Sequence, residues 1–212
     1  MNKDINIIKG KNIGETWMKY LNTVFNNCNQ YFDGDNKIFE VENLVLEIEE
    51  NSENDSILEK YADKHIIELY MKKMQTTEIV EELNASYGMR IFDQLGVDQY
   101  QWVLKRLRDK PETKAATISL LLPDDPGPRI PCLDILDFKI RENILYTKAF
   151  FRSQNVLRAY GNLKSMFWVS TKLADDLGVR MGSMVIFVSN AHYEEYEAIK
   201  VKKLLEDYDN DQ

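Results

Sequence analysis

The residue types best suited to covalent chemistry in this chain are the thiol of Cys132 and the guanidinium of Arg152. Cys132 directly follows Pro131, and Arg152 lies in the segment "FFRSQN" at 150–155. A positive charge beside a thiol favours the thiolate, which is the nucleophilic form of cysteine. Taken alone, Cys132 would more often be a small buried hydrophobe and Arg152 a surface ion-pair partner. Chemistry at this pair therefore depends on a fold that brings the two residues together.

The segment between them predicts a β-hairpin. In "ILDFKIRENILYTKAFF", apolar and charged residues alternate on both sides of Glu142-Asn143, a pair suited to a tight turn. Antiparallel pairing of the two strands brings the ends of the hairpin, and with them Cys132 and Arg152, to the same edge of a sheet. "SNAH" at 189–192 ends another apolar strand and adds His192, which by itself would more often be a histidine with a structural hydrogen bond.

The remaining pattern predicts one α+β domain, 1–212, built on a mixed sheet. Segments with helical spacing of apolar residues interleave with strand patterns, and no domain linker separates them. The acidic tail from about 206 is expected to fray. The expected helices cover 15–27, 57–74, a segment closed by Pro111, and 162–177, which stops at Gly178; the expected strands include 41–50, "AATISLLL" and "SMVIFVSNAHY".

Composition narrows the classes of partner. The chain of 212 residues has a net charge of −8 and 44% hydrophobic residues, which is typical of a globular protein and argues against a nucleic-acid partner. Two histidines and two cysteines disfavour a structural zinc site, so we expect no metal. Apolar runs are too short for a membrane span, and the low cysteine count is typical of a reducing compartment. We therefore expect a cytoplasmic protein with no membrane partner.

Taken in order, the segments "PCL", "FFRSQN", "GN" and "SNAHYEEY" resemble the thymidylate synthase family, including its short archaeal-type members and the related pyrimidine nucleotide hydroxymethylases. The resemblance runs from Tyr87-Gly88 to Tyr196, about half of the chain, and "GETWMKYL" and "NLVLEIE" match loosely before it. It implies a thymidylate synthase-like α+β fold in which helices flank a large twisted mixed sheet. It also implies a homodimer whose sheets pack face to face and share the active sites.

The resemblance implies roles for individual residues. Cys132 falls on the nucleophile that adds to C6 of the pyrimidine, and Tyr87 falls near the reacting carbon. For the glutamate that organises water and proton transfers we prefer Glu68 over Glu47, although a solvated carboxylate on a helix surface is an equally good interpretation of Glu68. The implied substrate contacts are Arg152, Ser153 and Lys114 at the 5′-phosphate, Asn162 at the uracil edge, and His192 and Tyr193 at the 3′-hydroxyl.

Three positions depart from the family pattern. Ala115 follows Lys114 where the family has two adjacent arginines, so one cation is missing. Asn155 stands where an aspartate contacts the folate, and an amide cannot accept a charge-assisted hydrogen bond as a carboxylate does. Leu133 replaces a residue that is often histidine. The cofactor contact at Asn155 is therefore the part of the resemblance most open to change.

The leading hypothesis is methylation of dUMP to dTMP, with 5,10-methylenetetrahydrofolate or methylenetetrahydromethanopterin as co-substrate. Asn162 favours uracil because an amide both donates and accepts, whereas an aspartate would suit the amino group of cytosine. Two alternatives stay open. One is a 5-hydroxymethyltransferase acting on dUMP or dCMP, in which water captures the methylene intermediate. The other is a catalytically weakened nucleotide-binding protein on the same fold.

Overall fold

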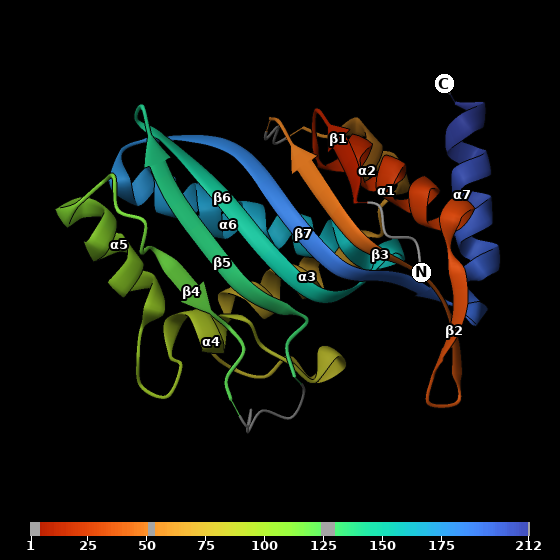
Figure 1. The fold of residues 1–212 in the computed structure, drawn as a ribbon, viewed down its shortest axis with the longest axis horizontal. Helices are drawn as coiled ribbons and strands as arrows, with labels where there is room; N and C mark the ends of the chain where they lie inside the picture. Colours follow the sequence, from red (N-terminus) through yellow and green to blue (C-terminus); the bar gives the residue numbers. More distant parts are fainter. Residues whose placement is uncertain (1–4, 51–53, 124–129, 212) are drawn as a thin grey trace.

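A seven-stranded mixed sheet forms the framework of the fold (Figure 1). The computed structural model describes residues 5–50, 54–123 and 130–211. The strands are β1 (Asn6–Gly10), β2 (Asn29–Asp33), β3 (Asn36–Ile48), β4 (Thr117–Ser119), β5 (Leu133–Arg141), β6 (Ile144–Asn155) and β7 (Arg180–Glu194). They lie in the order β1-β3-β7-β6-β5-β4, and β2 pairs with β3. The β1–β3 and β6–β7 pairs are parallel and the others antiparallel, which confirms the expected mixed sheet.

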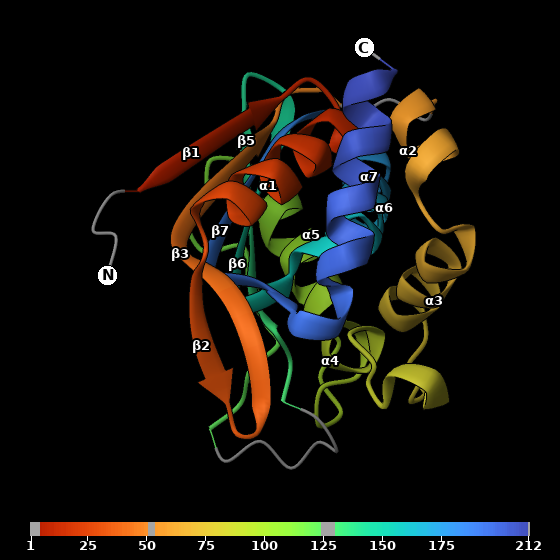
Figure 2. The ribbon, with the colours of Figure 1, turned by 90° about the vertical axis from the view of Figure 1, so that its right-hand side faces the viewer.

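Helices cover one side of this sheet. The α-helices are α1 (Ile13–Asn27), α2 (Ser56–Tyr61), α3 (Lys64–Gln75), α4 (Gly88–Phe92), α5 (Gln99–Asp109), α6 (Ala159–Leu177) and α7 (Ala198–Asn210), and the 3-10 helices are η1 (Glu81–Leu83), η2 (Val156–Arg158) and η3 (Glu195–Glu197). Figure 2 shows α1, α3, α6 and α7 on the same side of the strands. Within the described residues, none of these helices combines the length and apolar character that a membrane crossing requires.

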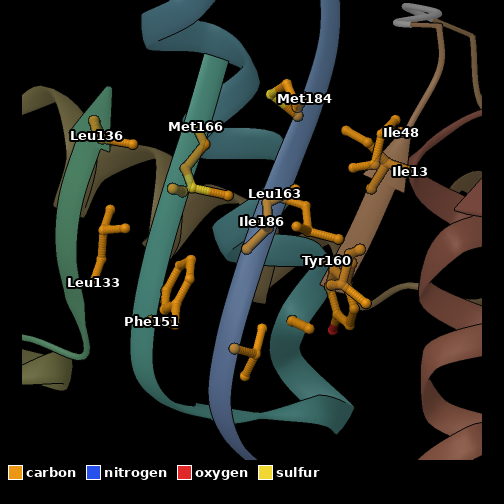
Figure 3. Close-up of a cluster of buried hydrophobic side chains, with 14 of the residues drawn as sticks. Ile13, Ile48, Leu133, Leu136, Phe151, Tyr160, Leu163, Met166, Met184 and Ile186 are labelled. Atoms are coloured by element: carbon orange, nitrogen blue, oxygen red, sulfur yellow. The ribbon is translucent and has the colours of Figure 1, made fainter. Parts of the chain in front are cut away.

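The hydrophobic core lies between the central strands and α6 (Figure 3). Leu133, Phe151 and Ile186 come from three adjacent strands, and Leu163 and Met166 come from α6. All five side chains are buried. Burying a side chain of this size contributes about 1.5–3 kcal/mol. The start of β5, next to Cys132, and the end of β6, which contains Arg152, therefore pack against a rigid core.

The expected hairpin is confirmed as β5 and β6. Glu142 and Asn143 form its turn, with φ angles of 52° and 60°, the left-handed pair that a two-residue type I′ turn requires. The pairing continues beyond β5, because the Arg152 amide donates to the Cys132 carbonyl at 3.0 Å. The main chains of Cys132 and Arg152 therefore lie side by side, as the hairpin pattern predicted.

Two expectations about helices are corrected. The helix expected over 57–74 is two helices, because the chain is extended at Ala62 and Asp63 caps α3 by accepting from the His65 amide at 2.9 Å. The tail expected to fray from about 206 instead belongs to α7, which continues to Asn210. Val201 and Leu205 are buried, and this packing holds the acidic end of the chain in a helix.

The side of the sheet away from the helices carries a continuous row of apolar residues. Register pairs Ile7 with Val45 and Val45 with Phe187. Phe187 in turn pairs with Phe150, and Phe150 with Ile135. Ile7, Phe187, Phe150 and Ile135 are 63%, 42%, 40% and 40% exposed. We call these five residues the apolar row; a contiguous exposed patch of this kind is typical of a protein interface.

Candidate active site

A cavity of about 170 Å³ lies where the C-terminal ends of β6 and β7 meet the loop before β5. Parallel pairing of β6 and β7 places their ends together, with Asn155 opposite His192. Among the described residues, no group of histidine, cysteine and acidic side chains is placed to hold a metal ion. Six residues expected at the site line this space, which we call the Cys132 cavity: Tyr87, Cys132, Ser153, Asn155, Asn162 and His192.

Arg152 holds the loop that carries the thiol. Its Nε donates to the Pro131 carbonyl at 2.8 Å, and its Nη2 donates to the Ile130 carbonyl at 3.2 Å. Cys132 itself is a free, half-buried cysteine. The guanidinium thus fixes the conformation of the loop that leads into the nucleophile candidate.

Tyr87 forms a buried wall of the Cys132 cavity. Its hydroxyl accepts from the Leu133 amide at 3.4 Å, and the Lys73 ammonium lies 3.6 Å from its ring centroid. Burial raises the pKa of Tyr87 well above its usual range, and the charge of Cys132 raises it further. Tyr87 therefore stays a neutral phenol, which can donate a hydrogen bond next to the thiol.

His192 is a neutral hydrogen-bonding group. Its Nδ1 lies 3.3 Å from the Ser153 hydroxyl oxygen. Burial lowers the pKa of His192, and the carboxylates of Glu197, Glu194 and Glu40 oppose this shift without reversing it. Such an imidazole suits a ligand hydroxyl better than a ligand phosphate.

Two buried amide side chains in the cavity wall lack partners. The Oδ1 of Asn162 is buried with no hydrogen bond to any described residue, and so are both amide atoms of Gln154. A buried polar atom without a partner costs about 1–3 kcal/mol. A ligand with complementary N–H and C=O groups would recover this cost, as the edge of a nucleobase does.

A second cavity of about 570 Å³ adjoins the first, and Arg158 lines both. Its walls come from α1, the α2–α3 junction, the start of α6 and α7, and include the aromatic rings of Trp17, Tyr61, Tyr160 and Tyr196. We call this space the aromatic cavity. Lys200 and Lys203 also line it, and neither side-chain ammonium group makes a hydrogen bond or ion pair with another described residue.

Comparison with known proteins identifies the family. The family model described as "Thymidylate synthase" matches residues 13–210. The chain belongs to the thymidylate synthase family. Proteins named "Putative thymidylate synthase" from Methanococcoides burtonii and Methanosarcina mazei are each 28% identical over 204 residues, covering 94% of this chain and 94% of each relative. One of the same name from Methanothermobacter marburgensis is 30% identical over 123 residues, 57% of this chain and 55% of that protein.

Tyr193, expected at the 3′-hydroxyl from the thymidylate synthase resemblance, does not lie in the Cys132 cavity. Successive residues of a strand point to opposite sides, and here His192 lines the cavity whereas Tyr193 does not. The Tyr193 ring stacks on Phe39 with centroids 5.1 Å apart, and its hydroxyl lies 3.6 Å from the Cys28 sulfur. Glu194, two residues after His192, lines the cavity instead.

Glu68 and Lys114 also lie outside the Cys132 cavity of this thymidylate synthase family member. Glu68 is exposed on α3 and lines a separate surface hollow, whereas Tyr70 and Lys73 of the same helix line the Cys132 cavity. The Lys114 carbonyl accepts from Lys139 at 3.1 Å. Lys139 is seven strand positions from Cys132, which places Lys114 about 20 Å from the thiol within one chain.

Sequence reasoning missed several residues of the site: Lys73, Gln154, Arg158, Glu194 and Glu197. Strand alternation from His192 could have found Glu194. Nothing local could have found Glu197, which is 4% exposed and pairs with Arg158, 39 residues away, at 2.7 Å. Asn155 is the other side-chain partner of Glu197, and its Nδ2 donates to that carboxylate at 2.7 Å.

Proposed function

We propose that this protein transfers a one-carbon unit to C5 of a pyrimidine deoxynucleotide, with methylation of dUMP as the leading reaction. The supporting observation is the single cavity that contains Cys132, Tyr87, Ser153, Asn162 and His192 in a member of the thymidylate synthase family. The five residues supply a nucleophile, a neutral phenol, a hydroxyl, a base-reading amide and a neutral imidazole. A nucleotide is the ligand class that needs this combination.

In the proposed reaction the Cys132 thiolate forms a bond to C6, and the electrons of the C5=C6 bond move to the C4 carbonyl oxygen as an enolate. C5 then bonds to the methylene carbon of the donor and loses its proton. The bond between the methylene carbon and the pterin nitrogen breaks, which leaves an exocyclic methylene on C5. The released tetrahydropterin then gives a hydride to this methylene and becomes a dihydropterin, and the bond between C6 and sulfur breaks to release the Cys132 thiolate. Asn162 matches the O4 and N3–H edge of uracil, and the neutral phenol of Tyr87 can donate to an oxygen beside the reacting carbons.

The aromatic cavity supports a reduced pterin as co-substrate. The Cys132 cavity, at about 170 Å³, is too small for both a nucleotide and a pterin. The adjoining space of about 570 Å³ provides aromatic walls for flat rings and two lysines for an anionic tail. Methylenetetrahydrofolate and methylenetetrahydromethanopterin both have flat rings and an anionic tail, so both are candidate co-substrates.

The test is incubation of the purified protein with 5-tritiated dUMP or dCMP and the methylene derivative of each pterin. We expect tritium release into water with dUMP, and a product mass that corresponds to added methyl. A product mass that corresponds to added hydroxymethyl would favour the hydroxymethyltransferase. Retained nucleotide binding without tritium release from either nucleotide would reject the enzyme and favour the nucleotide-binding alternative.

We also propose that the apolar row forms a homodimer interface. It crosses five strands on the face opposite α1, α3, α6 and α7 (Figure 2), and pairing two such faces would bury Phe150 and Phe187. Lys114 lies far from Cys132 of its own chain. In a dimer it could instead contact the Cys132 cavity of the other protomer.

Replacing Phe187 with aspartate should weaken dimerisation by about 100-fold, because a charge would be buried in an apolar interface. Sedimentation across a concentration series measures the effect. Ile199→Asp is the control, since Ile199 is 84% exposed on α7 and outside the row. A monomeric wild-type protein, or an unchanged dimer in Phe187→Asp, would contradict this interface.

A further inference from the structure

The carboxylate of Glu197 is buried and fully engaged. Its Oε2 accepts from Asn155 Nδ2 at 2.7 Å and from the Glu194 amide at 3.0 Å. Its Oε1 pairs with Arg158 Nη2 at 2.7 Å. Removing a charged group from water costs free energy, and a buried charge is retained only where it is paired. Here the contacts of Glu197 join η3, η2 and the ends of β6 and β7.

From this geometry we infer that Glu197 is a positioning residue of the active site. It holds Asn155 and Arg158 in the wall between the Cys132 cavity and the aromatic cavity, and it requires the residue at 155 to be an amide. The inference rests on the proposed function, because the two cavities are there assigned to a nucleotide and a reduced pterin.

The requirement for an amide follows from the distance between the two side chains. An aspartate at 155 would place two carboxylates about 2.7 Å apart where Asn155 now donates to Glu197. Two carboxylates this close cannot both ionise near neutral pH. The departure from the family aspartate at Asn155 is thus matched by a partner on another element, and it does not require loss of the pterin site.

The contacts of Asn155 also define what it can offer a ligand. Its Oδ1 accepts from the Arg158 amide at 3.3 Å as the cap of η2, and one of its two amide hydrogens is used on Glu197. The other hydrogen remains, so this position can donate to an acceptor atom of the pterin, where a carboxylate could only accept. Glu197 therefore sets the polarity of the contact at residue 155.

Arg158 is the second residue that Glu197 holds. It lines both cavities, and its Nη2 also donates to the Tyr196 hydroxyl at 3.4 Å. Glu197 raises the pKa of the guanidinium against the lowering effect of burial. Without the Glu197 carboxylate, the Arg158 guanidinium would lose the ion pair that fixes its position between the two cavities. Cys132 and Asn162 would keep their positions.

The experiment compares Glu197→Gln, Asn155→Asp and the double variant with wild type. Glu195→Gln is the matched control, because Glu195 lies in the same 3-10 helix but pairs with Lys37 at an exposed position. We expect Glu197→Gln to raise KM for the methylene-pterin about ten-fold and to change KM for dUMP less than about two-fold. The control should match wild type in both.

Asn155→Asp provides a signature in its pH profile. The charged or titratable groups near this carboxylate pair include Arg158, His192, Glu194, Tyr196 and Tyr70. The new pair should hold one extra proton, so KM for the pterin should be near wild type at pH 5.5 and about ten-fold higher at pH 8.5. Because the raised pKa belongs to the folded state, thermal stability should also fall as pH rises. The double variant, with an amide at 197, should lose this pH dependence.

An NMR titration of His192 is an independent check. Glu197 raises the pKa of His192, so Glu197→Gln should lower it further. The inference is overturned if KM for the pterin is unchanged in Glu197→Gln, or if Asn155→Asp shows no pH dependence that the double variant removes. Failure of the proposed function is a separate result: wild type would then release no tritium, while the coupling between 155 and 197 would still appear in the stability of the variants.

Discussion

Replacing Cys132 with serine should lower tritium release from C5 of dUMP by about 10³-fold or more, while the nucleotide Kd changes less than about three-fold. A serine hydroxyl is too weak an acid to supply the nucleophile that a thiolate supplies. Ser153, Asn162 and His192 line the same cavity and would still bind the nucleotide. Tritium release and equilibrium binding by calorimetry measure the two quantities.

Cys28→Ser is the matched control. Cys28 is also free and half-buried, but its sulfur lies 3.6 Å from the Tyr193 hydroxyl, outside the Cys132 cavity. We expect this variant to keep full activity. Unchanged turnover in Cys132→Ser would remove the thiol from the mechanism, and equal losses in both variants would indicate a general effect on folding.

Replacing Asn162 with aspartate should reverse the preference between the two pyrimidines. The buried Oδ1 of Asn162 has no partner among the described residues, so a ligand must satisfy it. An ionised carboxylate can accept from the amino group of cytosine but meets the O4 of uracil with a second acceptor. We expect kcat/KM for dUMP to fall about 10³-fold or more, with tritium release from dCMP rising above its wild-type level.

Asn143→Asp is the control for this change. Asn143 has a left-handed φ of 60° in the β5–β6 turn, where aspartate is well tolerated, and it lies at the far end of the hairpin from Cys132. The same substitution at this position should leave kcat/KM for dUMP and tritium release from dCMP unchanged. Retained preference for dUMP in Asn162→Asp would show that Asn162 does not read the base.

The sequence by itself determined the features that depend on local periodicity and turn chemistry. The alternation around Glu142-Asn143 predicted the hairpin, and the hairpin predicted that Cys132 and Arg152 would be neighbours. Gly178 predicted the end of α6, and it takes the left-handed conformation that this end requires. The order of motifs identified the family and six residues that share one cavity.

The expectations that the structure changed concerned orientation. Tyr193 is next to His192, yet strand alternation turns it towards Phe39. Glu68 lies in the helix expected to carry it, but the face that contains Glu68 is exposed. Which face of a helix or strand meets the site depends on packing against distant elements, and residue type alone does not encode it.

Only the tertiary structure decided the partners of Asn155. From the sequence, an amide at this position was a departure from the family pattern. Parallel pairing of β6 with β7 and the turn into α7 bring Glu197 to it across 42 residues. Local propensity carries no information about such a pair, because the hydrogen bond exists only once two separate strand ends have been packed together. The fold therefore determines which polar group position 155 must carry.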